Sequence, residues 1–178
     1  MDASEAGLTD GVITLRAATL ADSPALVAAV RSSVAELAPF MPWASPSYDE
    51  AAARSWLEGQ DSSAFQCVIV GDDGVLAGSC GLDQINEINH SANLGYWLRS
   101  DRTGRGWATR ATRLIARHGL TRMGLERVEI LMAVDNEASR RVAERAGATF
   151  EGTLRHRLLL HGVYHDAHLY SLIRSDLA

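Results

Sequence analysis

The chain has 178 residues, of which 47% are hydrophobic and 22% are charged, and this composition excludes a disordered or fibrous protein. All 17 basic residues are arginines, so the chain contains no lysine. Without a lysine amine it cannot be a Walker A nucleotide-binding protein, a pyridoxal enzyme or a Schiff-base aldolase. The length fits one domain with a core of its own.

The net charge of −5 is unevenly distributed along the chain. Residues 1–98 carry 3 arginines and 13 acidic residues, whereas residues 99–178 carry 14 arginines and 9 acidic residues. A basic half on an acidic chain favours a local anionic ligand over nucleic acid, which usually requires a basic domain. The alternative explanation of this basic half is that its arginines lie on solvent-exposed helix faces and bind no ligand.

The cysteines and the hydropathy of the chain indicate the cellular compartment of the protein. Cys67 and Cys80 lie in apolar stretches without a CxxC motif, which is typical of small core residues in a reducing compartment. No apolar run approaches the roughly 18 residues of a membrane span. Residues 1–5 are acidic, unlike a signal peptide. We therefore expect a cytoplasmic protein with no membrane partner.

The first third of the chain is expected to hold a loose leader (1–10), a strand (12–16) and a helix. The helix begins at the capping box of residues 19–22 and continues through apolar residues at helical spacing to Leu37. Prolines then flank the apolar loop 40–43, which is either a lid over the core or one wall of a substrate pocket.

A second capping box, Ser47-Tyr48-Asp49-Glu50, is expected to open a helix that ends near residue 60. Strands follow at 65–70, 75–82 and 92–99, and they form an antiparallel meander. The connections are a turn at 72–74 and a polar loop at 86–91.

The last part of the chain alternates helices and strands. It contains an amphipathic helix from Trp107, an apolar strand at 128–134, and a helix from Asn136 to the C-terminal glycine Gly147. A hairpin of strands 149–160 and 164–173 completes one α+β domain over residues 1–178. His161, His165 and His168 are not expected to bind a metal, because strand residues three apart face opposite sides.

The segment between the third meander strand and the amphipathic helix, residues 102–109, gives the clearest indication of a binding site. Gly104 and Gly106 allow a tight turn whose N–H groups join the free N–H groups of the helix start, and Arg102 and Arg105 add positive charge. This pattern predicts a pyrophosphate site, with a plain strand-to-helix turn as the alternative. A dinucleotide-binding fold does not fit, because only 69 residues follow Thr109 and they end in a hairpin.

Five blocks in a fixed order resemble the GNAT N-acetyltransferases, and within them the RimJ/RimL type, which acetylates protein N-termini and diverse small amines. The blocks are Leu94-Gly95-Tyr96-Trp97-Leu98, Gly104-Arg105-Gly106-Trp107-Ala108-Thr109, Asp135-Asn136-Glu137-Ala138-Ser139, Glu151-Gly152-Thr153-Leu154-Arg155 and Gly162-Val163-Tyr164-His165-Asp166. The resemblance implies a mixed central sheet of about seven strands, with a meander and a splayed central strand pair, flanked by about four helices. It implies acetyl-CoA as the donor and a primary amine as the acceptor, with no metal.

The resemblance also implies which residues hold the donor. The pyrophosphate would lie on the backbone of residues 104–108, the pantetheine along the open strand edge, and an N–H near Tyr96 to Leu98 would stabilise the oxyanion. Arg140 and Arg141 are expected either to reach the 3′-phosphate or to coat their helix. The expected donor-binding residues are Tyr96, Trp97, Leu98, Arg99, Arg102, Thr103, Gly104, Arg105, Gly106, Trp107, Ala108, Thr109, Asn136, Ser139 and Arg141.

Catalysis is expected to involve Ser139, which matches the family's general acid. Two positions where the family pattern has glutamate hold Asn93 and Leu158 instead. The remaining candidates for a general base are Glu87 and His90, on the polar loop before the aromatic strand, or a water relay. The missing glutamates leave a second function open, a non-catalytic sensor that binds acyl-CoA. Apolar surface around residues 40–43 and the last hairpin would permit a homodimer.

Overall fold

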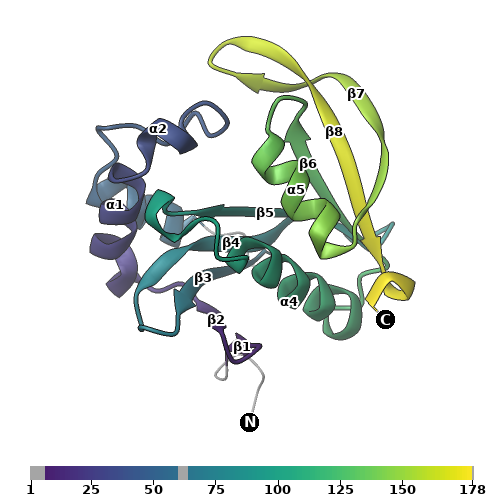
Figure 1. Cartoon of the computed structure of the whole chain (residues 1–178), viewed down its shortest axis with the longest axis horizontal. Coiled ribbons are helices and arrows are strands. Elements are labelled where there is room, and N and C mark those ends of the chain that lie inside the picture. The colour runs from purple at the N-terminus through teal and green to yellow at the C-terminus, as the bar shows by residue number, and fades with distance from the viewer. Residues whose placement is uncertain (1–6, 60–63, 178) are drawn as a thin grey trace.

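The computed structural model describes residues 7–59 and 64–177, which form one mixed sheet with helices packed on it (Figure 1). Within these residues the sheet has eight strands in the order β1-β2-β3-β4-β5-β6-β8-β7, and only the β5–β6 pair is parallel. The strands are β1 (Leu8–Thr9), β2 (Ile13–Ala17), β3 (Phe65–Gly71), β4 (Leu76–Asn86), β5 (Ser91–Leu98), β6 (Arg127–Ala133), β7 (Thr149–Leu160) and β8 (Val163–Ile173).

Five α-helices and three short 3-10 helices connect these strands in the described part of the chain. They are η1 (Leu20–Asp22), α1 (Ser23–Arg31), α2 (Val34–Leu37), α3 (Glu50–Glu58), η2 (Ser100–Arg102), α4 (Trp107–Arg122), α5 (Glu137–Ala146) and η3 (Arg174–Leu177). The predicted α+β class, meander and C-terminal hairpin are confirmed, with one strand and one helix more than expected. In the described residues, no helix is both long and apolar enough to cross a membrane.

The extra strand lies inside the predicted leader. Leu8 and Thr9 pair with Leu15 and Thr14 of β2, so this stretch is part of the sheet and not a loose segment. Residues 1–6 of the predicted leader lie outside the described residues.

Two helix predictions need correction. The helix expected to run to Leu37 is broken between α1 and α2, where the Ser33 hydroxyl accepts a hydrogen bond from the backbone N–H of Ser100, 3.0 Å away. The next helix, α3, is capped by Asp49 and not by Ser47, because the Asp49 carboxylate accepts the N–H of Ala52 at 2.8 Å. Its expected end near residue 60 lies outside the described residues, and α3 ends at Glu58.

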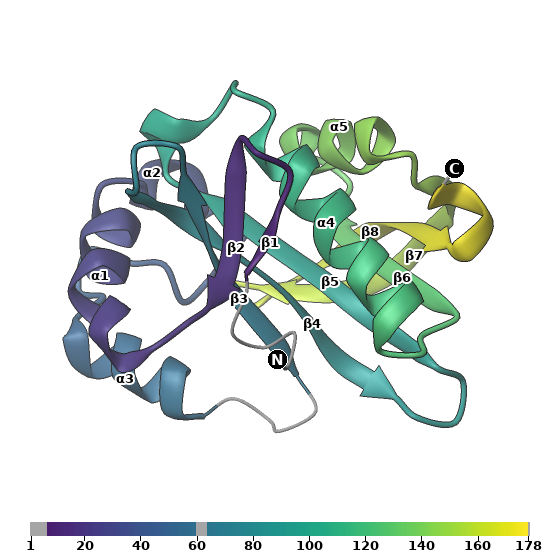
Figure 2. The ribbon, with the colours of Figure 1, turned by 90° about the horizontal axis from the view of Figure 1, so that it is seen from below.

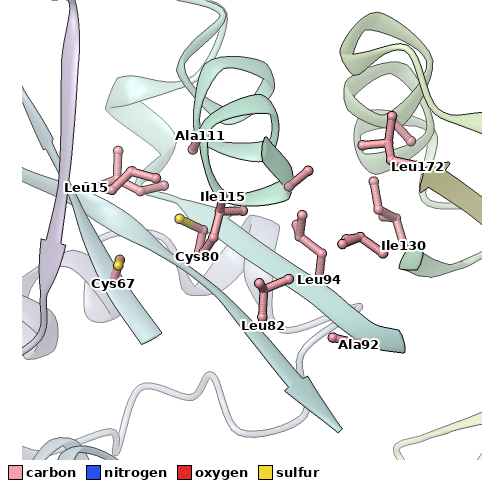
Figure 3. Close-up of a cluster of buried hydrophobic side chains, with 14 of the residues drawn as sticks. Leu15, Cys67, Cys80, Leu82, Ala92, Leu94, Ala111, Ile115, Ile130 and Leu172 are labelled. Atoms are coloured by element: carbon pink, nitrogen blue, oxygen red, sulfur yellow. The ribbon is translucent and has the colours of Figure 1, made fainter. Parts of the chain in front are cut away.

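The main core holds α4 against the sheet and continues past β5 to β6 and β8. Figure 3 shows Ala111 and Ile115 of α4 above Leu94 of β5, with Ile130 and Leu172 farther along the same cluster. Each fully buried leucine or isoleucine contributes about 1.5–3 kcal/mol. This packing fixes the start of α4 relative to β5, and the site depends on that arrangement. Figure 2 shows α4 running along the sheet, with α1 and α3 grouped beside β2 and β3.

Both cysteines are core residues, as predicted. Cys67 and Cys80 are 1% exposed, face each other across β3 and β4, and are free thiols. Burial raises the pKa of Cys67 to about 11, so its thiol stays protonated and unreactive at neutral pH.

An ion pair across the last strands predicts acid sensitivity. Arg127 donates two hydrogen bonds to Glu151, and Ser171 donates a third, which together lower the pKa of that carboxyl to about 2. Because the folded pKa lies below the ordinary value of 4.5, this stabilisation is complete above pH 4.5 and is lost as the pH falls towards 2. We expect Glu151→Gln to lower the melting temperature at pH 7 and to lower it less at pH 3. An equal loss at both pH values would contradict this.

Candidate active site

The central feature of the site is the divergence of β5 from β6. The two strands pair at only three positions, from Ser91–Arg127 to Asn93–Glu129, and then separate (Figure 1). Beyond that point β5 stays paired with β4, and β6 stays paired with β8. The edges of residues 94–98 and 130–133 that face each other therefore have no strand partner. Such edges can hydrogen-bond an extended, amide-containing ligand, and the predicted splay is confirmed.

The glycine loop lies between the end of β5 and the start of α4. Gly104 and Gly106 adopt φ values of +75° and +77°, and a Cβ added to either would meet no protein atom within 4 Å. Gly106 is the N-cap of α4 and offers no side chain to the free N–H groups of the helix. Trp107 is buried beneath the loop, while Ala108 and Thr109 continue the first turn. Open space beside free N–H groups at a helix start fits a pyrophosphate.

The arginines of the loop have different surroundings. Arg102 lies 2.5 Å from the Asp73 carboxylate in the β3–β4 turn, and its side chain is 14% exposed. This ion pair joins the loop to the β3–β4 turn, and contact of Arg102 with a phosphate stays a prediction. Arg105 is exposed and lies over Trp107 at 5.4 Å, and no carboxylate of the described residues pairs with it. Arg99 pairs with Asp101 at 3.0 Å.

Ser139 and Tyr96 meet across the divergence. The Tyr96 hydroxyl lies 2.9 Å from the Ser139 hydroxyl and donates to the Ser139 carbonyl at 3.0 Å. Burial raises the pKa of Tyr96 to about 12, so the phenol keeps its proton at neutral pH. Asn136 caps α5 by accepting the Ser139 N–H at 3.0 Å, so the serine side chain is not the cap.

A cavity of about 540 Å³ opens on the sheet face opposite α4. Tyr96 packs against the main core, and both Tyr96 and Trp97, its neighbour on β5, are among the residues that line this cavity. Met41 and Trp43 also line it, and Trp43 is 46% exposed. Loop 40–43 therefore forms one wall of this cavity, and its role in binding a substrate stays a prediction.

The comparison with known proteins identifies the family. Residues 13–149 match the family described as "Acetyltransferase (GNAT) domain". The chain belongs to the GNAT acetyltransferase family. The divergence of β5 from β6 agrees with the splayed strand pair that the resemblance to this family implies. The roles of the glycine loop and of Ser139 stay predictions.

Individual relatives point to the RimJ/RimL type. The putative ribosomal N-acetyltransferase YdaF of Bacillus subtilis is 38% identical over 104 residues, which span 58% of this chain and 57% of YdaF. RimL, a ribosomal L7/L12 alpha-N-protein acetyltransferase solved with coenzyme A, has a TM-score of 0.85 and 29% identity, covering 96% of this chain and 98% of RimL. The microcin C7 self immunity acetyltransferase MccE, solved with acetyl-CoA and AMP, has a TM-score of 0.85 and 27% identity, covering 97% and 99%.

The two candidate bases of the sequence lie away from the GNAT site. Glu87 and His90 are exposed on the β4–β5 turn, and the N–H of Glu126 bonds the His90 carbonyl at 2.7 Å. At about 3.3 Å per strand residue, this turn is about 20 Å along β5 from Tyr96. The structure does not bring either side chain to Ser139, which argues against both as the base.

The arginines of α5 face solvent. Arg140 pairs with Glu137 and Glu144 on its own helix, and Arg141 is 53% exposed and 3.8 Å from Glu137. Arg140 therefore coats the helix, and contact of Arg141 with a 3′-phosphate stays a prediction.

Asp83 is a pocket residue that the sequence analysis missed. It lines the cavity on β4, and its carboxylate accepts a hydrogen bond from the Asn93 side chain at 2.9 Å. In the sequence analysis, Asn93 is named only as the residue at a position where the family pattern has glutamate. The observation that could have revealed Asp83 as a pocket residue is the pairing of β4 with β5, which places Asp83 directly opposite Asn93.

The surroundings of Arg105 predict a salt effect. If its charge faces the phosphates of the donor, added salt screens this attraction, because the Debye length is about 8 Å at physiological ionic strength. We expect Arg105→Ala to weaken CoA binding at low salt and to flatten its dependence on ionic strength in calorimetry. Arg122→Ala, which removes an exposed arginine at the other end of α4, is the matched control and should retain the wild-type slope.

Proposed function

We propose that the protein transfers the acetyl group of acetyl-CoA to a primary amine, either a protein or peptide N-terminus or a small amine. The proposal rests above all on one arrangement: the unpaired edge of β5 leads from the glycine loop to the Ser139–Tyr96 pair. The free, unbridged thiols of Cys67 and Cys80 support a cytoplasmic site of action.

In the proposed reaction each part of the site has one task. The backbone N–H groups of residues 104–108 hold the pyrophosphate, and the open edge of β5 holds the pantetheine amides. An N–H in residues 96–98 donates to the thioester oxygen as negative charge develops there. The neutral amine forms the new C–N bond, and the C–S bond breaks. The nitrogen releases one proton to water, while Ser139 provides a proton to the leaving sulfur, directly or through water, and is itself reprotonated by water.

A thiol-release assay with acetyl-CoA and a panel of amines tests the proposal. The panel contains N-terminal peptides, spermidine and small monoamines, and mass spectrometry identifies the acetylated product. Because the chain has no lysine, acetylation of its own lysine side chains cannot contribute to the signal. CoA binding without turnover of any amine would contradict the proposal and favour the acyl-CoA sensor.

We also propose a homodimer that buries the β7–β8 hairpin. Leu159, Val163 and Tyr164 are 56–61% exposed, and contiguous apolar surface of this kind often marks a protein interface. Light scattering should give twice the mass of the chain, and a monomeric mass at micromolar concentration would contradict the dimer.

A further inference from the structure

The lining of the 540 Å³ cavity includes Ser79, Gly81 and Asp83 of β4 and Gly95 and Trp97 of β5. Across the two strands Ser79 pairs with Trp97, Gly81 pairs with Gly95, and Asp83 pairs with Asn93. The middle pair has no side chains, and a Cβ added to Gly95 would meet nothing within 4 Å. Open space therefore lies beside Gly95, between an aromatic end at Trp97 and an acidic end at Asp83, whereas the Gln66 side chain covers Gly81.

Asp83 is the one charged residue among those that line the cavity within the described residues. Its Oδ1 accepts the Asn93 amide at 2.9 Å, and no described residue donates to Oδ2. The Gln66 side chain lies over Gly81, where a Cβ would come within 2.0 Å of its amide oxygen. The acidic end thus offers a carboxylate oxygen and a neutral amide, and the described residues that line the cavity include no arginine to pair with an anionic group.

The aromatic end is formed by rings from the loop before α3 and from β5. Trp43 meets Trp97 edge-on with ring centroids 5.9 Å apart, and Tyr48 lies 5.8 Å from Trp43. Rings at such distances and tilts provide a preformed surface for another planar or apolar group. Because Trp43 is 46% exposed, this end is also the mouth of the cavity.

From this arrangement we infer the class of acceptor: a primary amine with a single positive charge, an aromatic or other apolar group, and no carboxylate beside the amine. Asp83 binds the ammonium form of the amine, which releases one proton to water before the neutral nitrogen attacks the thioester, and Trp43 and Trp97 hold the apolar group. The inference rests on the proposed acetyl transfer and specifies its substrate. A peptide N-terminus with an apolar first residue and a free arylalkylamine share this chemistry.

The same arrangement disfavours two other classes of amine. A free amino acid would bring its own carboxylate close to Asp83, and the lining residues that the structure describes include no cation to pair with it. Burial of such an unpaired charge is costly. A polyamine carries further ammonium groups besides the one that Asp83 binds. Among the described residues that line the cavity, these extra charges would find no second carboxylate.

The first experiment compares acceptors that differ in one group. We expect kcat/KM for phenylalaninamide to be at least tenfold higher than kcat/KM for phenylalanine, which differs from it only in having a carboxylate. We expect it to be at least tenfold higher than kcat/KM for spermidine as well. Phenethylamine and a peptide that begins with phenylalanine then distinguish a free amine from a chain terminus. Equal or better turnover of phenylalanine or spermidine would overturn the inference and leave acetyl transfer standing, whereas no turnover of any amine would refute acetyl transfer itself.

The second experiment changes the two ends of the cavity separately. Asp83→Asn should raise KM for phenylalaninamide at least tenfold without changing acetyl-CoA affinity or the melting temperature. Trp43→Ala should reduce the preference for phenylalaninamide over alaninamide at least fivefold. Glu58→Gln removes an exposed carboxylate from α3 outside the cavity and is the matched control, with wild-type constants expected. Unchanged KM in Asp83→Asn, or an unchanged preference in Trp43→Ala, would overturn the inference.

Discussion

Ser139→Ala is expected to lower kcat by about 10²- to 10⁴-fold while the affinity for acetyl-CoA changes little. A thiolate leaves poorly until it gains a proton, and an interaction made only in the transition state affects kcat without affecting ground-state binding. The structure removes the competing explanation that Ser139 is a helix cap, because the Asn136 side chain accepts the Ser139 N–H. The melting temperature should fall slightly, since one hydrogen bond to Tyr96 worth about 1 kcal/mol is lost.

Tyr96→Phe is the matched variant for this measurement. It removes the same 2.9 Å contact but leaves the serine hydroxyl in place. If Ser139 is the proton donor, Tyr96→Phe should retain far more activity than Ser139→Ala at a similar melting temperature. A normal kcat in Ser139→Ala would show that the serine is structural and that water alone protonates the sulfur.

Gly106→Val is expected to weaken CoA binding by at least tenfold, which corresponds to about 1.4 kcal/mol. At φ +77° a branched side chain strains the backbone, and its Cβ would project into the open space where we place the pyrophosphate. The measurement is CoA affinity by calorimetry together with the melting temperature.

Gly124→Val separates backbone strain from loss of the site. Gly124 has φ +76° and equally open surroundings, but it follows the C-terminal end of α4. It should lose stability as Gly106→Val does and keep its affinity for CoA. Undiminished CoA binding by Gly106→Val would remove the loop from the donor site.

The parts of the site that depend on local sequence could be predicted. Two glycines predict the loop, and apolar residues at helical spacing predict α4; both signals lie within a short stretch of sequence. Gly147 ends α5 in the left-handed conformation that is typical of a glycine after a helix. The splay has no local signal, because β5 and β6 are each ordinary strands. It was predicted only through the resemblance of five separate blocks to one family.

The parts that depend on distant contacts could not be predicted. The break between α1 and α2 involves a bond from Ser100 to Ser33, which helical periodicity cannot reveal. Glu87 and His90 are close to the aromatic strand in sequence, yet the β4–β5 turn carries them away from Ser139. Asp83 looks like an ordinary strand residue until the register of β4 and β5 places Asn93 opposite it.

The divergence of β5 from β6 also has a consequence for hydrogen exchange. Along residues 94–98 alternate amides point to β4 and to the gap, so neighbouring amides on one strand should exchange with solvent at very different rates. The main core packs residues of β5 and β6 against α4, so the gap does not depend on loose packing. In the free protein the slow and fast amides should therefore alternate along a well-ordered strand, and bound CoA should slow only the fast ones.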